Sequence, residues 1–264
     1  LSERIRTKEM RVVAVIPARM ASSRFPGKPM ALIHGIPMIG HCYFRVKMCQ
    51  QVEETYVATC DTEIYDYIVS IGGKAIMTSD AHERASDRTA EAMLKIEENS
   101  GQRAEIVVMV QGDEPMDTPN MISQALEPLV QDNVIDVVNL MGAIETVEEF
   151  EDPNTVKVVV GPDDNAIYFS REPIPSRKKS VDIVPMLKQI CIIPFRRDYL
   201  LQFNETPETP LEQIESVDMM RVIESGRQVK MVMTKEESYG VDTPEDLRKV
   251  GVKMKGDLLM TKYS

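Results

Sequence analysis

The chain has 264 residues, enough for one large α/β domain or for a domain with a small appendage. Its 31 Lys and Arg residues against 42 Asp and Glu residues give a net charge of −11, which argues against a non-specific binder of nucleic acids or anionic membranes. The four cysteines form no CxxC pair, no histidines stand at metal-ligand spacing, and no apolar stretch reaches transmembrane length. These features predict a cytoplasmic protein that uses neither disulfides nor zinc.

The first predicted element follows a charged segment, residues 1–10, which we expect to be an N-terminal extension. Residues 12–16 are β-branched or small and apolar, which is typical of a buried strand. The strand leads into a Pro-rich loop that contains Gly27 and three cations. Backbone N–H groups and cations in such a loop can bind phosphate oxygens, so we predict a phosphate site, with an ordinary solvated loop as the alternative. The three cations are Arg19, Arg24 and Lys28.

Strands and helices then alternate. A helix with one apolar face is expected over residues 39–49, and a further helix from Thr118-Pro119 onward. This alternation indicates a mostly parallel central sheet with helices on both faces. In such a sheet, ligands bind at the edge shared by the loops after Ile16, Met77 and Val110. The other expected elements are strands at 55–59, 75–77, 104–110 and 135–140 and a helix at 64–71.

The second half of the chain differs in composition. Residues 171–188 are polar and Pro-rich, which predicts a mobile loop that serves as a lid or as a dimer contact. Its cations at 177–179 favour a solvated face over a phosphate-closing role. Thr243-Pro244-Glu245-Asp246 predicts the cap of the last helix. The remaining expected elements are a hairpin at 156–160 and 166–170, an apolar run at 190–195, a helix at 211–224 and a strand at 229–233.

Two aspartates stand where a metal ion would need ligands. Asp113 follows the buried strand at 104–110 and is expected to face the cations of the first loop. Carboxylate oxygens beside phosphates suit Mg²⁺. Asp242 is a second candidate, although an aspartate before Thr-Pro is also a routine helix cap. No Ser, Cys or His is paired with a base, and the Walker and dinucleotide-binding spacings are absent from the sequence.

Four short motifs occur in a characteristic order and spacing. They are Ile16-Pro17-Ala18-Arg19 with Ser23-Arg24-Phe25-Pro26-Gly27-Lys28-Pro29, Val110-Gln111-Gly112-Asp113-Glu114-Pro115, Tyr168-Phe169-Ser170-Arg171, and Gly240-Val241-Asp242-Thr243-Pro244-Glu245-Asp246-Leu247. Through them the chain resembles the 3-deoxy-manno-octulosonate cytidylyltransferases, the CMP-Kdo synthetase family. The resemblance implies a fold like that of the nucleotide-diphospho-sugar transferases. It also implies a reaction in which CTP and an acidic acceptor give the CMP-acceptor and pyrophosphate.

The resemblance implies a role for each matching residue. Residues 81–88 fall where the family has its cytosine-side loop. The CTP-binding residues implied are Ala18, Arg19, Arg24, Lys28, Ser86 and Arg88. The Mg²⁺ ligands implied are Asp113 and Asp242, which together with Arg19 and Lys28 are the expected catalytic groups. The acceptor-binding residues implied are Gln111, Arg171, Gln189, Ile193 and Asp218.

The chain departs from the family pattern on both sides of the site. The cytosine-side loop usually reads Ser-Gly-Thr before an acid and an arginine, and here it reads Arg84-Ala85-Ser86-Asp87-Arg88. Gln189 and Ile193 stand for a His and a Tyr, and Asp218 for a Glu, which changes the contacts available to sugar hydroxyls. The acceptor therefore stays open between 3-deoxy-manno-octulosonate, another sugar acid and a phosphonate. A non-catalytic nucleotide-binding module is the remote alternative, against which the two metal carboxylates argue.

The resemblance also implies an organisation and a set of partners. We expect one cytidylyltransferase domain over residues 11–255, with a dimerisation and acceptor subdomain inserted at about 150–210. The expected partners are CTP, a small anionic acceptor and a second copy of the chain in a homodimer, with neither nucleic acid nor a membrane. In-line attack of an acceptor oxygen on the α-phosphorus needs positioning and charge neutralisation, and no protein nucleophile.

Overall fold

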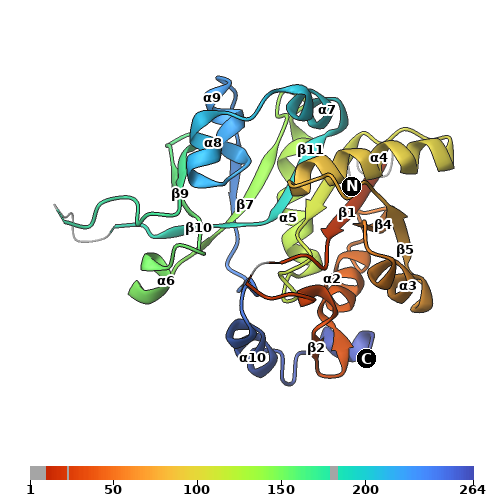
Figure 1. Ribbon diagram of the computed structural model, residues 1–264. Coiled ribbons are helices and arrows are strands. Elements are labelled where there is room, and N and C mark those ends of the chain that lie inside the picture. The colour runs from red at the N-terminus through yellow and green to blue at the C-terminus, as the bar shows by residue number, and fades with distance from the viewer. Residues whose placement is uncertain (1–9, 23, 179–183) are drawn as a thin grey trace.

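A computed structural model describes residues 10–22, 24–178 and 184–264 of the chain (Figure 1). Its first sheet has the strand order β11-β6-β1-β4-β5. Of the five strands in this sheet, β1, β4, β5 and β6 run parallel to one another, and β11 is antiparallel to β6. The predicted mostly parallel sheet is thus confirmed, with one antiparallel edge strand. The strands are β1 (Val12–Ala18), β4 (Glu54–Thr59), β5 (Lys74–Met77), β6 (Ile106–Val110) and β11 (Ile192–Arg196).

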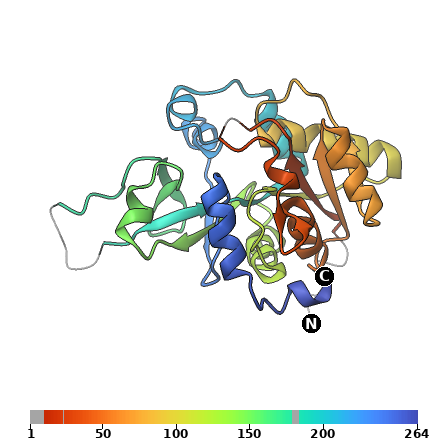
Figure 2. The same ribbon diagram turned by 60° about the horizontal axis from the view of Figure 1, so that its bottom comes forward.

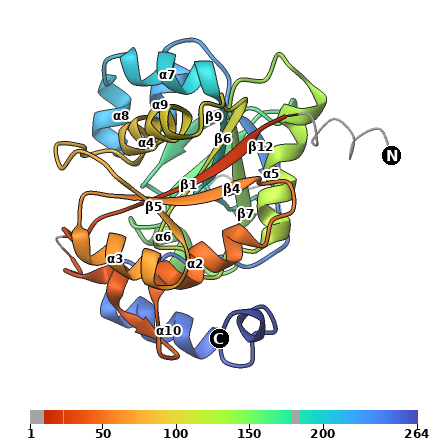
Figure 3. The ribbon, with the colours of Figure 1, turned by 90° about the vertical axis from the view of Figure 1, so that its right-hand side faces the viewer.

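Helices cover both faces of this sheet, as expected. Val12, Ala14 and Ile16 of β1 pack into one core cluster, whereas Val13 and Val15 pack into the other. Side chains alternate between the faces of a strand, so a strand covered on both sides is apolar at every position. Figure 3 shows α2 and α3 on one side of the strands and α4 and α7 on the other. The covering helices are α2 (Met38–Lys47), α3 (Thr62–Ser70) and α5 (Pro119–Gln131) on the first face, and α4 (Ala85–Ser100) and α7 (Arg197–Glu205) on the second.

A second sheet has the order β12-β7-β10-β8-β9. The predicted hairpin is confirmed as the antiparallel pair β8 and β9, which projects away from the first sheet (green in Figure 2). The strand expected at 135–140 is β7, which begins three residues later and pairs with β10 and β12 of the second sheet instead of joining the first. The strands are β7 (Val138–Ala143), β8 (Lys157–Val160), β9 (Ala166–Ser170), β10 (Leu187–Ile190) and β12 (Lys230–Met233).

The apolar run at 190–195 is divided between the two sheets. Cys191 alone separates β10, in the second sheet, from β11, in the first. The N–H of Gln111 donates to the Cys191 carbonyl at 3.1 Å, and the N–H of Cys191 donates to Oε1 of Glu114 at 3.2 Å. The chain therefore crosses between the sheets against the loop that follows β6.

The prediction of a single helix at 211–224 is wrong. The structure has two short helices, α8 (Pro210–Glu215) and α9 (Met219–Glu224), because Ser216 adopts a left-handed conformation with φ of 52°. The turn between them carries Asp218 to the cleft described below. Sequence analysis did not predict α7, nor α4, whose first turn begins within the expected cytosine-side loop. It also did not predict α6 (Val147–Glu151), the pair β2 (Leu32–Ile33) and β3 (Ile36–Pro37), or the 3₁₀ turns η1 (Lys28–Met30) and η2 (Met260–Lys262).

The C-terminal part of the chain packs against α2. The last helix, α10 (Pro244–Lys253), begins at the predicted cap, where Thr243 accepts a hydrogen bond from the N–H of Asp246. Beyond it, the Tyr263 hydroxyl hydrogen-bonds Nδ1 of His41 at 2.9 Å and accepts from Nε of Arg45 at 3.1 Å. Arg45 is buried and also donates to the Met116 carbonyl at 3.2 Å. This segment is thus connected to the loop after β6.

Some expectations stay predictions. A dimerisation and acceptor subdomain at about 150–210 is one of them. Within that range β8, β9 and β10 belong to the second sheet, whereas β11 and α7 pack on the first. Ser23 of the first loop, and Lys179 with residues 180–183 of the expected mobile loop, lie outside the described residues, as do residues 1–9.

Candidate active site

A cleft of about 1270 Å³ opens at the carboxyl ends of β1 and β6 and is lined by residues of both sheets. The parallel pairing of β1, β4 and β6 explains its position, because the loops that follow these strands meet at one edge. Every predicted site residue lines this cleft except Ser86, which is fully buried behind it. The structure therefore brings together residues that are more than 200 positions apart in the sequence, such as Lys28 and Asp242.

The predicted phosphate loop is built on Gly27. Its φ of 73° is a left-handed conformation that glycine adopts without strain, and its N–H donates to the Met20 carbonyl at 3.1 Å. The N–H of Met20 in turn donates to Asp61, at the end of β4, at 2.8 Å. Arg19 is exposed in the cleft and has no polar partner among the described residues, so its guanidinium is available to an anion. Arg24 is held by Asn154 and by Asp242.

Lys28 joins the two predicted metal ligands. Its Nζ donates to Oδ2 of Asp113 at 2.8 Å, lies 3.6 Å from Oδ1 of Asp242, and donates to the Val241 carbonyl at 2.7 Å. The two carboxylates therefore converge on one positive charge. Gly112 makes this approach possible, because a Cβ there would stand 2.9 Å from Ile39 and 3.1 Å from the Pro17 carbonyl.

This arrangement fits a divalent ion that binds together with a nucleotide. Two carboxylates on neighbouring loops supply hard oxygen ligands, as Mg²⁺ prefers. No group of three or more His, Cys, Asp or Glu side chains arranged to hold a metal occurs in the described part of the chain. Mg²⁺ at nucleotide sites is usually held by one or two carboxylates together with substrate phosphate oxygens and water, a role that Asp113 and Asp242 would fit.

The residues expected on the nucleotide side mainly hold the protein itself. Arg88 is buried at the edge of the cleft, and its guanidinium donates to Thr78 and to the carbonyls of Ser79 at 3.2 Å and His82 at 3.4 Å. Ser86 donates to Oδ2 of Asp218 at 2.8 Å. These bonds shape the loop at 78–84 and hold Asp218, which also lines the cleft, a role that residue type and spacing do not reveal.

Asp218 lines the cleft next to this loop. Burial raises the pKa of the Asp218 carboxyl, and the Ser86 hydrogen bond and the positive charge of Arg84 oppose this rise. Nη1 of Arg84 lies 3.5 Å from Oδ1 of Asp218, and its Nε donates to Glu208 at 3.0 Å. Arg84, which was not predicted as a site residue, thus provides a cation at the cleft beside Asp218.

Arg171 lines the cleft, but its guanidinium is bound by backbone carbonyls. Nε donates to Glu215 O at 2.7 Å, Nη1 to Pro153 O at 2.9 Å, and Nη2 to Ser216 O at 3.2 Å. It therefore connects the α8–α9 turn with the turn after α6. The buried Lys157 supports the same turn through bonds to Asp152 O and Thr155 O at 2.9 and 2.6 Å. In this structure Arg171 shapes the acceptor side of the cleft.

A buried acidic pair lies behind Asp113. Oγ of Ser238 lies within hydrogen-bond distance of Oε2 of Glu114, at 2.8 Å, and of Oδ1 of Asp117, at 2.7 Å, and its single hydrogen can be donated to one of them at a time. Burial and then the charge of Glu114 raise the pKa of Asp117 well above its ordinary range. Burial and then the charge of Asp113 raise the pKa of Glu114. Sequence analysis missed this pair because nothing in the local sequence shows that both side chains are buried.

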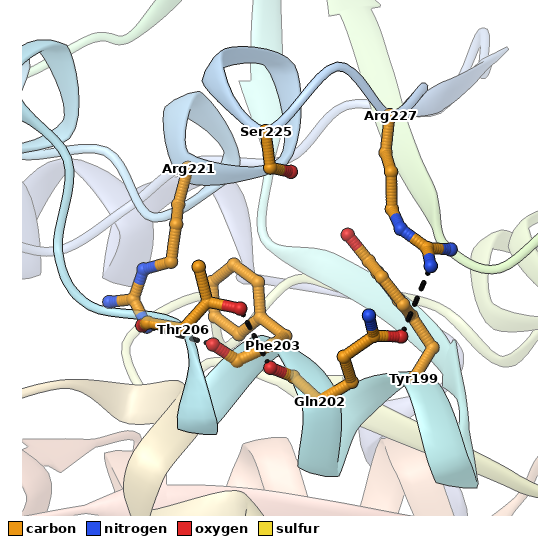
Figure 4. Close-up of a pocket in the computed structure, with 7 residues that line it drawn as sticks. All are labelled: Tyr199, Gln202, Phe203, Thr206, Arg221, Ser225 and Arg227. Carbon is orange, nitrogen blue, oxygen red and sulfur yellow. Dashed lines mark hydrogen bonds between the residues drawn. The ribbon is translucent and has the colours of Figure 1, made fainter.

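A smaller pocket, of about 120 Å³, lies between α7 and the α9 region (Figure 4). None of the predicted site residues lines it. Its two cations already have protein partners: Arg221 pairs with Glu212 at 2.6 Å, and Arg227 donates to Gln202 at 3.1 Å. We therefore place the functional site in the large cleft.

Comparison with known proteins agrees with this geometry. A sequence model of the cytidylyltransferase family matches residues 13–235, which include the phosphate loop, Asp113 and the second sheet. The chain belongs to the cytidylyltransferase family. Within this family it belongs to the 3-deoxy-manno-octulosonate cytidylyltransferases, as the motifs in its sequence predict.

Two relatives and one solved structure illustrate the similarity. The 3-deoxy-manno-octulosonate cytidylyltransferase of Geobacter metallireducens is 42% identical over 255 residues, which cover 93% of this chain and 98% of the relative. That of Geobacter sulfurreducens is 41% identical over 256 residues, covering 93% and 100%. The structure of a CMP:2-keto-3-deoxy-manno-octonic acid synthetase complexed with CTP is 39% identical and superposes with a TM-score of 0.85 over 94% of this chain and all of that one. No described helix of this cytidylyltransferase is long and apolar enough to cross a membrane.

Proposed function

We propose that the protein transfers the CMP group of CTP to 3-deoxy-manno-octulosonate, or to a related ulosonic acid, and releases pyrophosphate. The observation that carries the proposal is the convergence of Lys28, Asp113 and Asp242 beside the phosphate loop. Family membership supports it, because the relatives that match over nearly their whole length are named for this acceptor, and the similar solved structure is complexed with CTP.

The cations of the first loop bind the triphosphate in this proposal. Arg19 is available without rearrangement, whereas Arg24 and Lys28 exchange their carboxylate partners for phosphate oxygens. The exchange is favourable because a triphosphate offers more negative charge than one carboxylate and because charge-assisted bonds to phosphate are strong. Ala18, at the end of β1, places this loop beside the nucleotide.

Asp113 and Asp242 hold Mg²⁺ in this proposal. When bound, the ion neutralises charge on the phosphate oxygens and aligns the α-phosphorus for in-line attack. The protein supplies the two carboxylates, and Lys28 keeps them together until the nucleotide arrives. Glu114 and Asp117 lie behind them in a buried network that fixes the loop.

The acceptor approaches from the side of the cleft formed by Gln111, Arg171, Gln189, Ile193 and Asp218. A hydroxyl oxygen of the acceptor forms a bond to the α-phosphorus, the bond from this phosphorus to the bridging oxygen of the β-phosphate breaks, and the hydroxyl proton passes to solvent. Pyrophosphate leaves with the bridging oxygen. The side chains contribute by positioning and by electrostatic stabilisation, which together can supply most of the rate enhancement in such a transfer.

The proposal includes a cytoplasmic homodimer. The four cysteines are free, which supports a reducing compartment where CTP is also present. The projecting β8–β9 hairpin supports a role in contacts between copies, because β9 is the outer strand of the second sheet and has an exposed apolar side chain, Ile167.

The test is pyrophosphate release with CTP and Mg²⁺ against a panel of acceptors: 3-deoxy-manno-octulosonate, other ulosonic acids and small phosphonates. Release with 3-deoxy-manno-octulosonate is the expected result. Release with a phosphonate and with no ulosonic acid would replace the proposed acceptor. Binding of CTP without release from any acceptor on the panel would overturn the proposed acceptor and leave the cytidylyltransferase assignment standing.

A further inference from the structure

A buried asparagine that sequence analysis did not single out lies beneath the acceptor side of the cleft. Asn139, on β7, is fully buried, and its side chain contacts Gln189, which is on the neighbouring strand β10 and lines the cleft. The register pairs Gln189 with Met141, two residues from Asn139, so the Asn139 and Gln189 side chains lie on the same face of the sheet. The contact is therefore fixed by strand pairing and does not depend on a loop.

The backbone determines the orientation of the Asn139 amide. Its Nδ2 donates one hydrogen to Leu140 O at 2.9 Å and the other to Ile190 O at 2.8 Å. A flipped amide would set Oδ1 against two carbonyl oxygens, neither of which can donate a hydrogen bond. Oδ1 must therefore face Gln189 and needs a donor, which Gln189 supplies through Nε2.

This orientation decides what Gln189 offers to a ligand. One Nε2 hydrogen is bound by Asn139, which turns Oε1 to the other end of the amide, where it makes no hydrogen bond to the described residues; Oε1 is therefore the unpartnered acceptor of this cleft-lining side chain. A carbonyl oxygen only accepts hydrogen bonds, so it attracts a hydroxyl group and repels the oxygens of a carboxylate or phosphonate. Ile190 and Ile193, which also line the cleft, have no hydrogen-bonding side chains.

We propose that Asn139 is a positioning residue for acceptor selection, which holds Gln189 with its carbonyl oxygen toward the cleft to accept a hydrogen bond from an acceptor hydroxyl. This inference rests on the proposed function and narrows it. It selects polyhydroxy acids, which have a hydroxyl donor to place here, over acceptors that present only anionic oxygens at this point.

The first test is a double-mutant cycle that compares the KM for 3-deoxy-manno-octulosonate with the KM for CTP. Gln189→Met keeps the side-chain length without the acceptor oxygen and should raise the acceptor KM by about fivefold to tenfold, the effect of one hydrogen bond, while the CTP KM stays unchanged. Asn139→Ala should raise the acceptor KM by a similar factor, and the double variant by no more than either alone. Gln202→Met, in the small pocket, is the matched control and should change neither KM.

A second experiment does not depend on the Asn139→Ala variant, which could fail to fold. Acceptor analogues in which one hydroxyl is replaced by fluorine keep an acceptor atom but lose the donor. One such analogue should show the same rise in KM with the wild-type enzyme. Gln189→Met should no longer distinguish that analogue from the parent acid. Equal discrimination by the wild type and by Gln189→Met, or additive effects in the double-mutant cycle, would overturn the inference.

A third measurement tests the orientation of the Gln189 side-chain amide directly and needs no activity assay. In NMR spectra the Nε2 protons of Gln189, identified by their absence in Gln189→Met, should exchange slowly with solvent in the wild type and rapidly in Asn139→Ala. Rapid exchange of these protons in the wild type would overturn the inferred orientation of Gln189 and leave the proposed function standing. Absence of pyrophosphate release from every acceptor would overturn the proposed function, and with it the acceptor role of Gln189, so the two failures are distinguishable.

Discussion

The substitution Asp113→Asn distinguishes the contribution of Asp113 to catalysis from its contribution to the stability of the protein. Asp113 has two partners in our proposal: Lys28, which the structure shows at 2.8 Å, and the Mg²⁺ that arrives with CTP. Asparagine has nearly the same shape and keeps one oxygen that can accept from Lys28. It lacks the negative charge that a divalent ion requires. We therefore expect a folded protein with very little activity.

The structure allows estimates of how far Asp113→Asn lowers the unfolding free energy and the turnover. At 2.8 Å and an effective dielectric constant of about 20, the gross attraction between Lys28 and Asp113 is about 6 kcal/mol. Desolvation and the retained hydrogen bond offset most of it, since the Asp113 side chain is 29% exposed, and we expect a net loss of about 1–2 kcal/mol in unfolding free energy. That corresponds to a Tm lower by only a few degrees for a chain of this size. The turnover should fall by at least about a hundredfold, as when other enzymes lose one charge-stabilising group.

The assay measures pyrophosphate release across a Mg²⁺ titration, together with thermal unfolding. Asp198→Asn is a suitable control, because Asp198, like Asp113, is paired with a basic side chain, here Arg103, but lies outside the cleft. The control should retain wild-type turnover at every Mg²⁺ concentration. Unchanged release by Asp113→Asn would remove Asp113 from the metal site, and a large drop in Tm would show that Asp113 is mainly structural.

Three further predictions follow from contacts outside the metal site. Arg171→Ala should raise the acceptor KM by about tenfold or more with little change in the CTP KM, because the α8–α9 turn loses two carbonyl contacts and the turn after α6 loses one. Arg171→Lys should not restore the KM, and Arg177→Ala, on the same segment, is the control. Burial raises the pKa of the Glu91 carboxyl, but hydrogen bonds from Lys95, the Ser79 N–H and His82 lower it to about 2. The stability that this carboxylate provides is therefore complete above its unfolded pKa of 4.5 and is lost as the pH falls toward 2. Urea denaturation of Glu91→Gln should show a smaller loss of stability over that interval, and an unchanged pH profile would contradict the assignment. Tyr263→Phe should lower the unfolding free energy by about 1–2 kcal/mol in urea, since His41 and Arg45 lose a shared partner, whereas Tyr65→Phe should have no such effect.

Local sequence was sufficient for most of the first sheet and for the position of the loop after β1 at the cleft. The residues of β1 are apolar at every position because both faces are covered, and the Pro-rich loop after it can only be irregular. Strand alternation then placed the ends of β1, β5 and β6 at one edge. These features depend on neighbours in the sequence and on general rules of parallel sheets.

The acceptor side depended on contacts that the sequence does not show. The run at 190–195 is apolar on both sides of Cys191, so nothing marks the change of sheet. Ser216 is polar and occurs within a helical pattern, and nothing in the local sequence marks its left-handed conformation. The family resemblance implies that Arg171 binds the acceptor, whereas its donors here reach carbonyls of residues that are distant in the sequence. Asn139 was missed for the same reason.

The crossover at Cys191 also has a mechanical consequence. One residue contributes only two soft torsions, too few for β10 and β11 to rotate independently of each other. A tilt of the second sheet is therefore transmitted to β11 and from there to its hydrogen-bonded partner β6, whose end carries Asp113. The two sheets that line the cleft are thus joined at Cys191 by a single residue of continuous backbone, next to the loop that carries Asp113.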